Sequence, residues 1–290
     1  MTENLNIKKR KIGLALGGGG AKGLAHIGVI KEIERAGLEI SYITGTSMGA
    51  LVGAWYASTK DISTLEKLFL GVKKDDVYTA GKIARKHDGL IFKDSSIPDF
   101  LESHFSKFNF EDCKIPFKAI ATDVKNGEQV VLEVGNIADA VRASTALPVV
   151  FSPVQIDGRL LMDGGFVNPV PADVVKEMGS DFVIAVDVSS KWFNLTEEHL
   201  NVLHVYALIA AAMSVIEYQI ASRVLTSSAD FVLRPNVLNH HWLDFGSARE
   251  LIAHGEQEAH DKISEICAHV GHTMPEKAPF EKFMDLILYK

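Results

Sequence analysis

A serine stands between two closely spaced glycines in Gly45-Thr46-Ser47-Met48-Gly49. The apolar residues 40–44 precede this stretch and the helix-like residues 50–57 follow it. Strand, sharp turn and helix are the setting of a nucleophile elbow, which exposes the serine hydroxyl. The glycines suit such a turn because a Cβ at either flank would clash with crowded backbone. The helix start also directs N–H groups and a positive dipole end at the space above Ser47, where an oxyanion would form. An ordinary tight strand-to-helix turn has the same local pattern, so other motifs must decide between the two.

A glycine run follows the strand-like residues 11–16 and reads Gly17-Gly18-Gly19-Gly20-Ala21-Lys22-Gly23. Such a run leaves several backbone N–H groups free to converge on an anion at the mouth of a helix. Residues 18–23 also match the dinucleotide fingerprint G-x-G-x-x-G, which requires an acidic residue about 20 positions later, at the end of the second strand. Glu39 lies near that position but opens the strand, and the serine elbow closes it. The pattern therefore favours an oxyanion loop over a dinucleotide site.

A third motif, Asp163-Gly164-Gly165, follows the alternating residues 159–162. Most Asp-Gly pairs are turns, and the pairs at 88–89 and 157–158 are interpreted that way. Asp163 differs because it lies between an apolar strand and residues 165–169, a setting that predicts partial burial.

The three motifs, in this order, resemble the patatin-like phospholipases, in particular their small bacterial single-domain members. The stretches 24–29, 143–148 and 154–171 also look like this family, so the resemblance covers roughly residues 10–270. One departure is Lys22, which stands where arginine is more typical. Lysine keeps the positive charge but lacks the planar guanidinium group of arginine. The difference therefore affects a bidentate contact at this position and leaves the backbone N–H groups of the glycine loop unchanged.

The resemblance implies a serine lipid acyl hydrolase (phospholipase A, lysophospholipase or carboxylic-ester hydrolase) with a Ser-Asp dyad and no cofactor. Ser47 is then the nucleophile and Asp163 the general base, and the amides of Gly18, Gly19 and Gly20 form the oxyanion hole. The remaining motif residues are Lys22, Gly23, Gly45, Gly49, Gly164 and Gly165. The implied fold is α/β, with three layers and a central, mostly parallel sheet flanked by helices. Residues 11–275 form the expected catalytic domain, between an N-terminal tail of residues 1–10 and a C-terminal extension of residues 276–290.

Hydrophobic patterning along the chain agrees with one α/β domain. Strand-like segments are residues 11–16, 40–44, 117–122, 129–134 and 182–188. Residues 202–225 are predicted to form a largely buried helix. A capping box at residues 247–250 predicts the start of a long helix. Its inward positions are Ile252, Gly255, Ala259, Ile263, Ile266 and Val270.

Composition is that of a globular enzyme: of 290 residues, 47% are hydrophobic and 23% charged. A formal net charge of −7 argues against a nucleic-acid partner, which would usually want a basic face. Cys113 and Cys267 are far apart and outside any metal-type spacing, as expected for free thiols in a reducing compartment.

We expect a cytoplasmic protein that is at most peripheral at the membrane. The basic residues 8–11 precede only five apolar residues, whereas a signal peptide needs an apolar region of about 7–15 residues. The longest apolar stretch, residues 205–216, is shorter than the ~20 residues of a membrane span. A fatty-acyl ester of a phospholipid or lysophospholipid is the expected substrate, which implies transient contact with a membrane surface. A homo-oligomer is compatible with the sequence.

Several alternatives stay open at this level. Four apolar residues near the motifs either form the wall of an acyl-chain site or belong to the hydrophobic core; they are Leu147, Val149, Val150 and Phe151. Residues 71–94 form either a mobile flap or a plain surface excursion. The chain is alternatively an α/β-hydrolase with a Ser-Asp-His triad, or a catalytically weak regulatory module of the same fold.

Metal independence is the first testable expectation. His240-His241 and the pair His269 and His272 are accompanied by no HExxH or comparable ligand set. EDTA should therefore leave the hydrolysis of a p-nitrophenyl ester unchanged. A loss of activity that calcium or zinc specifically restores would contradict this.

Overall fold

The computed structural model describes residues 10–71, 83–86, 89–92, 96–148, 151–189 and 205–275, without the side chains of 83–86, 89–92, 96–99, 205–211 and 213. Strands β3 (Ile83–Lys86) and β4 (Gly89–Phe92) pair antiparallel to each other. The turn predicted at residues 88–89 is not tested, because residue 88 lies outside the described residues. The rest of the suspected flap lies outside the described residues. So do the predicted extension and, apart from residue 10, the predicted tail.

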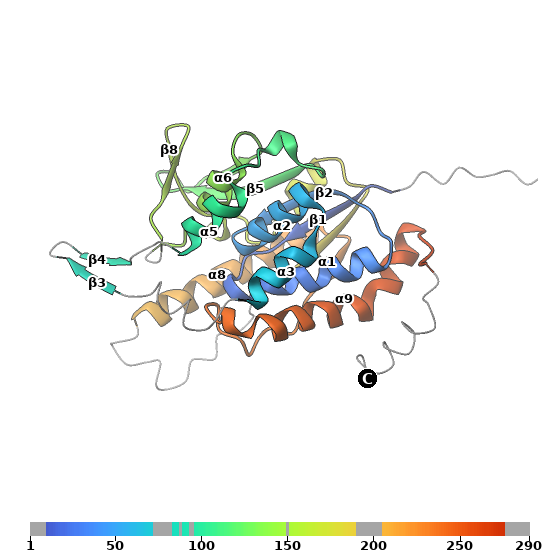
Figure 1. The fold of residues 1–290 in the computed structure, drawn as a ribbon. Helices are drawn as coiled ribbons and strands as arrows, with labels where there is room; N and C mark the ends of the chain where they lie inside the picture. Colours follow the sequence, from blue (N-terminus) through green and yellow to red (C-terminus); the bar gives the residue numbers. More distant parts are fainter. Residues whose placement is uncertain are drawn as a thin grey trace, which may run out of the picture.

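Eight further strands of the described chain form one sheet (Figure 1). Five of them run parallel, in the order β10-β9-β1-β2-β5, and β6, β7 and β8 are antiparallel additions at the β5 end. The mostly parallel α/β sheet expected from the sequence is confirmed. The strands are β1 (Ile12–Leu16), β2 (Ile40–Thr46), β5 (Phe117–Asp123), β6 (Gln129–Leu132), β7 (Val154–Ile156), β8 (Arg159–Asp163), β9 (Phe182–Val186) and β10 (Phe231–Leu233).

Helices cover both faces of the sheet and complete three layers (Figure 1). Side chains alternate across β1 because successive residues of a strand point to opposite faces. Leu14 and Leu16 therefore enter the larger core with α1, α2 and α9, and Ala15 enters a smaller core with α7 and α8. The described helices are α1 (Ala25–Arg35), α2 (Met48–Thr59), α3 (Ile62–Leu70), α5 (Ser96–Phe105), α6 (Ile137–Ser144), α7 (Ala172–Glu177), α8 (Val205–Ser228) and α9 (Ala248–Val270).

Two details of the helix predictions are wrong. The helix α8 is not largely buried in its described part, since Val215 and Ile216 are each 51% exposed. Its apolar residues run around the whole helix, and only one side meets the core. The capping box at the start of α9 does not form, because the Ser247 hydroxyl donates to Asp244 (2.6 Å) instead of capping the helix.

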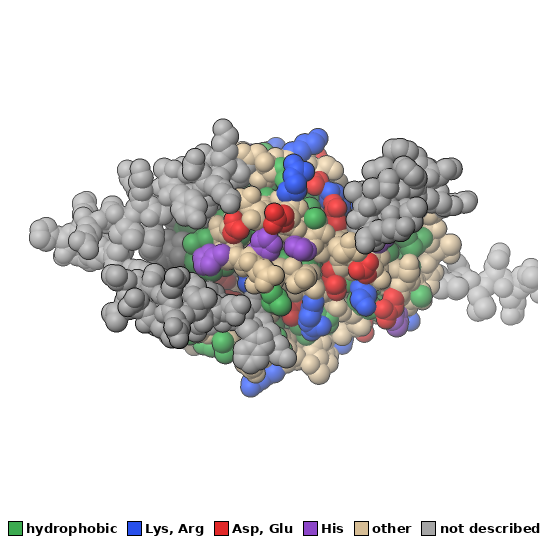
Figure 2. Space-filling model, turned by 90° about the horizontal axis from the view of Figure 1, so that it is seen from below, with side chains coloured by type: hydrophobic (Ala, Val, Ile, Leu, Met, Phe, Trp, Pro, Cys, Tyr) green, Lys and Arg blue, Asp and Glu red, His purple; other side chains and the backbone are tan. Residues whose placement is uncertain are grey.

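The helices α1 and α9 lie side by side at two glycines (Figure 1). A Cβ on Gly255 would run into the carbonyl of Ala25, and a Cβ on Gly28 into the backbone of α9. The predicted inward position of Gly255 is confirmed, and its reason is the close approach of two helix backbones. The outer surface on this side, seen from below, mixes acidic, basic and histidine side chains with scattered hydrophobic ones (Figure 2).

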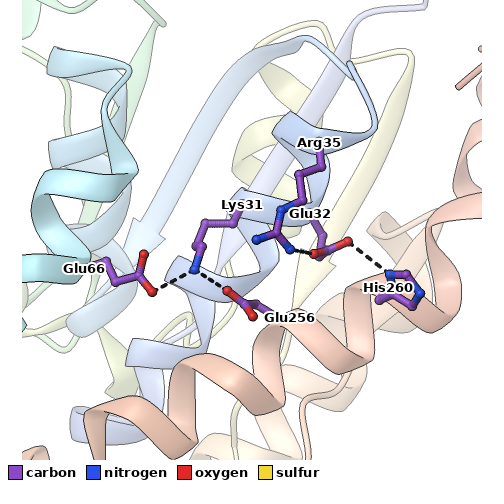
Figure 3. A network of polar contacts seen from close by, with 6 residues as sticks. All are labelled: Lys31, Glu32, Arg35, Glu66, Glu256 and His260. Atoms are coloured by element: carbon purple, nitrogen blue, oxygen red, sulfur yellow. Dashed lines mark hydrogen bonds and ion pairs between the residues drawn. The ribbon is translucent and has the colours of Figure 1, made fainter. Parts of the chain in front are cut away.

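A polar network ties α3 and α9 to α1 (Figure 3). The Lys31 ammonium of α1 pairs with Glu66 of α3 (2.7 Å) and with Glu256 of α9. Burial alone would lower the pKa of Lys31, but its hydrogen bonds to the two glutamates outweigh burial and raise it. Glu32, which is buried, pairs with Arg35 and with His260 of α9 (3.3 Å). The network adds specificity to a packing arrangement that the glycines permit.

The α1–α9 contact predicts that Gly255→Ala destabilises the fold. Alanine gains about 1 kcal/mol in helix propensity, but overpacking costs roughly 1–3 kcal/mol. The clash is with backbone that cannot rotate away, so we expect a lower urea midpoint. Gly71→Ala is the matched control, since a Cβ there meets ordinary contacts of 3.4 and 3.5 Å. Equal stability of the two variants would contradict the packing argument.

Candidate active site

Strand β5 brings Ser47 and Asp163 to the same level of the sheet. On one side Thr46, the last residue of β2, pairs with Ile120 of β5. Asp163, the last residue of β8, pairs with Ala121, the next residue of β5. Two residues far apart in the chain therefore come to the same level on either side of β5.

The backbone at Ser47 has the conformation of a strained elbow. Its φ of 55° and ψ of −123° lie in a region that L-residues rarely adopt. A Cβ on Gly45 would meet the carbonyl of Gly49, and a Cβ on Gly49 would meet the carbonyl of Leu16. The predicted crowding at both flanking glycines is thus present in the structure.

The carboxyl group of Asp163 is buried, with the residue only 4% exposed. It accepts a hydrogen bond from the Gly165 N–H (2.8 Å), and the Ser47 side chain lies close enough to lower its pKa. Burial raises the pKa of Asp163 to about 6, although the Gly165 N–H and the Ser47 side chain oppose the shift. An aspartate held in this way is ionised at neutral pH and a stronger base than a solvated one.

The glycine loop follows β1 and lies against the elbow, where a Cβ on Gly18 would come within 3.3 Å of the Ser47 Cβ. The Gly18 N–H, however, donates to the Pro169 carbonyl (2.9 Å), and the Ala21 N–H donates to the Trp242 carbonyl (2.7 Å). Within the described chain, no acceptor takes the N–H groups of Gly19 and Gly20. Of the three amides predicted to form an oxyanion hole, that of Gly18 therefore already has an acceptor within the protein, and those of Gly19 and Gly20 remain predictions.

Lys22 and Gly23 belong to the 3-10 turn η1 (Gly20–Leu24) behind the glycine loop. The side chain of Lys22 is buried, and burial lowers its pKa while Glu217 opposes the shift. Gly23 leaves room for the side chain of Met48, whose Cγ would lie 2.5 Å from a Cβ there. Both residues therefore shape the region between the loop and the elbow.

His26 lies fully buried next to the same turn. Its Nε2 donates to the Gly17 carbonyl (2.7 Å), and its Nδ1 has no hydrogen-bond partner among the described residues. Burial lowers the pKa of His26 to about 4, opposed by the Gly17 hydrogen bond, so the ring is neutral at pH 7. Among the described residues, no three histidine, cysteine, aspartate or glutamate side chains converge to hold a metal ion.

Three residues of this site escaped the sequence analysis. The Ser144 hydroxyl accepts the Ser47 N–H (2.9 Å) and donates to the Ile120 carbonyl (2.6 Å), which ties the elbow to β5. The Asn168 carbonyl accepts from the Thr46 hydroxyl (2.7 Å). Glu217 reaches the site from α8. Ser144 and Asn168 lie in the family-like stretches 143–148 and 154–171, and Glu217 interrupts an apolar run; these were the available signals.

The raised pKa of Asp163 predicts that Asp163→Asn stabilises the protein at neutral pH. The native state holds the proton more tightly than the unfolded chain, whose value is 3.8, so stability falls as pH rises toward 6. Asparagine removes this cost, which is at most about 3 kcal/mol for a shift of about two units.

Urea unfolding at pH 5.0 and 7.5 measures the effect, and the gain should be larger at pH 7.5. Asp139→Asn is the control, because the Asp139 side chain is 60% exposed. A variant at residue 163 that is less stable than the wild type at pH 7.5 would contradict the burial argument.

Several known proteins are similar in sequence to this chain. A 34% identical stretch of 206 residues, 66% of this chain, matches 55% of an uncharacterised NTE-family protein of Mycobacterium bovis. The chain is also 34% identical over 189 residues, 62% of its length, to 13% of human patatin-like phospholipase domain-containing protein 6. It is 35% identical over 184 residues to 13% of neuropathy target esterase sws of Drosophila melanogaster. The chain thus spans about half the length of the mycobacterial relative and a small part of the animal proteins.

Among solved structures, VipD from Legionella pneumophila aligns with a TM-score of 0.49 at 14% identity, over 89% of this chain and 67% of VipD. The family model described as patatin-like phospholipase matches residues 14–176, which is more than half of the chain and contains all three motifs. The chain belongs to the patatin-like phospholipase family.

Proposed function

We propose that this protein is a serine hydrolase of lipid acyl esters, with Ser47 as nucleophile and Asp163 as general base. The observation that carries the proposal is the buried Asp163 carboxyl group of raised pKa, to which the Ser47 side chain lies close enough to influence that pKa. A base must lie within hydrogen-bond reach of the proton that it removes. The strained elbow and the family membership support the same assignment.

Acylation follows from this arrangement. Asp163 takes the hydroxyl proton while the Ser47 Oγ attacks the ester carbonyl carbon, whose π electrons move to the oxygen. The N–H groups of Gly19 and Gly20 are the donors that we assign to this oxyanion; one such donor is worth roughly 3 kcal/mol. The bond to the alcohol then breaks, and the leaving oxygen takes the proton from Asp163. Water then attacks the carbonyl carbon of the acyl-enzyme while Asp163 takes a proton from it. The bond to the Ser47 Oγ breaks, the Oγ takes the proton from Asp163, and the fatty acid is released.

No third residue is needed to orient the base in this scheme. A histidine has two tautomers and needs a partner to select one, whereas a carboxylate has none. The position of Asp163 is held by the Gly165 N–H. His26, the buried histidine beside the glycine loop, bonds to the Gly17 carbonyl instead of to Ser47. This disfavours a Ser-Asp-His triad, and the intact dyad geometry disfavours a purely regulatory module.

A phospholipid or lysophospholipid is the substrate class that we infer from the family. Leu147 and Phe151 are half-buried, and Leu147 follows Ala146, whose carbonyl accepts the Asp163 N–H (3.0 Å). Val149 and Val150 lie outside the described residues. No helix in the described part of the chain is long and apolar enough to cross a membrane.

Transient contact with a lipid surface is supported by exposed apolar side chains that border the site. Leu243, which is 43% exposed, directly follows Trp242, whose carbonyl accepts from the glycine loop, and Leu238, four residues before Trp242, is 54% exposed. Val215 and Ile216, each 51% exposed, come from the helix that carries Glu217.

Substitution of the dyad tests the proposal. Ser47→Ala should abolish both p-nitrophenyl ester hydrolysis and labelling by a fluorophosphonate probe. Asp163→Asn keeps the shape of the base but removes the proton acceptor, so hydrolysis should fall by about 10²–10⁴-fold. Initial rates and gel fluorescence of the labelled protein measure the two effects.

Ser58→Ala is the matched control, since Ser58 is a buried serine of α2 whose hydroxyl donates to the Ala54 carbonyl (2.8 Å) and contacts the Cys113 Sγ (3.7 Å), away from the dyad. It should keep wild-type labelling. Labelling retained in the Ser47→Ala variant would overturn the nucleophile, and full activity of Asp163→Asn would move the protein to the histidine-triad hydrolases.

A further inference from the structure

Glu217 comes to the dyad from α8, which packs on the face of the sheet opposite to α2, the helix of the elbow. It lies on the inward side of α8, in line with the buried Ala221 and Leu225. Residues four positions apart share a helix face, so the packing of Ala221 and Leu225 in the smaller core turns the Glu217 side chain toward the sheet. The neighbouring Val215 and Ile216 face outward.

The carboxyl group of Glu217 lies in the space that a side chain on Gly165 would fill. A Cβ on Gly165 would come within 2.6 Å of the Glu217 Oε1 and 3.2 Å of the Asp163 Oδ1. The two carboxyl oxygens are therefore less than about 6 Å apart, close enough for each charge to affect the other. The absence of a side chain at Gly165, the last residue of the Asp-Gly-Gly motif, is what makes this approach possible.

Two charged groups act on the carboxyl group of Glu217. Asp163 acts on it from β8 and the buried Lys22 acts on it from η1. Among the described side chains of α7, Lys176 reaches α8 only near its end, at the Ser227 carbonyl (3.4 Å). Burial, then the Asp163 charge, raises the pKa of Glu217 to about 8, and Lys22 opposes the shift.

We propose that Glu217 is a positioning residue of the dyad, whose carboxyl group beside Asp163 controls the basicity of Asp163. This inference rests on the proposed function. Near neutral pH the Glu217 carboxyl carries a proton and Asp163 is ionised. When Glu217 also ionises, its charge favours transfer of the Ser47 proton to Asp163, because negative charge then moves away from Glu217 toward the glycine loop.

The inference predicts two steps in the pH profile of kcat/KM. The first, near pH 6, reports ionisation of Asp163, and the second, near pH 8, reports ionisation of Glu217 and raises kcat/KM by up to about tenfold. Glu217→Gln imitates the protonated acid, so it should keep the first step and lose the second. Lys22→Met removes the opposing cation and should move the second step to higher pH. Glu177→Gln, an exposed glutamate of the neighbouring α7, is the matched control and should keep both steps.

Fluorophosphonate labelling at pH 7 separates this inference from the function on which it rests. Absence of label in the wild type overturns the proposed function. If the wild type is labelled, a second step that survives in Glu217→Gln, or a wild-type profile with one step, overturns the role of Glu217.

Glu217→Asp covers the case in which the glutamine variant does not fold. The shorter side chain withdraws the carboxyl group from Asp163, so the second step should move to lower pH. An unchanged second step in this variant also overturns the inference.

Discussion

Four hydrogen bonds hold residues 163–171 across the carboxyl ends of the central strands, and the candidate site depends on them. The Thr122 hydroxyl donates to the Asp163 carbonyl (2.7 Å), and the Gly18 N–H donates to the Pro169 carbonyl. The remaining two join the Thr44 hydroxyl to Pro171 (2.8 Å) and the Thr46 hydroxyl to Asn168 (2.7 Å). Because a buried polar group without a partner costs about 1–3 kcal/mol, this segment cannot slide along the sheet. Asp163 is thereby held at the level of the elbow.

The candidate site contains several features that are unfavourable in free energy. Ser47 has a positive φ, and two carboxyl groups, those of Asp163 and Glu217, approach each other with raised pKa values. Such strain and desolvation persist only where surrounding structure over-determines them. The packing of α1 against α9, with its glycine contact and its Lys31 network, belongs to the large core that supplies this support (Figure 3). Functional geometry and global stability are therefore coupled through the sheet.

Local sequence patterns predicted most of the elements because each pattern reflects a requirement of its own residues. The strand predicted at residues 11–16 is present as β1. The inward stripe of α9 follows from burial on one face, and it is confirmed. The prediction that α8 is largely buried was wrong, because an apolar run alone does not show which side of a helix packs against the rest of the protein. The capping box failed for a related reason, as Asp244 competes for the Ser247 hydroxyl.

By itself, the sequence determined the α/β class, the three motifs, their order and the crowding at Gly45 and Gly49, because backbone conformation and close approach are demands of the local chain. Only the tertiary structure decided which loop amides remain available, since the acceptor of the Gly18 N–H belongs to residue 169. It also decided that Ser144 supports the elbow and that Glu217 lies beside Asp163. These partners are distant in the chain, and a hydrogen bond or a charge interaction depends on distance in space, which the order of strands in the sheet sets.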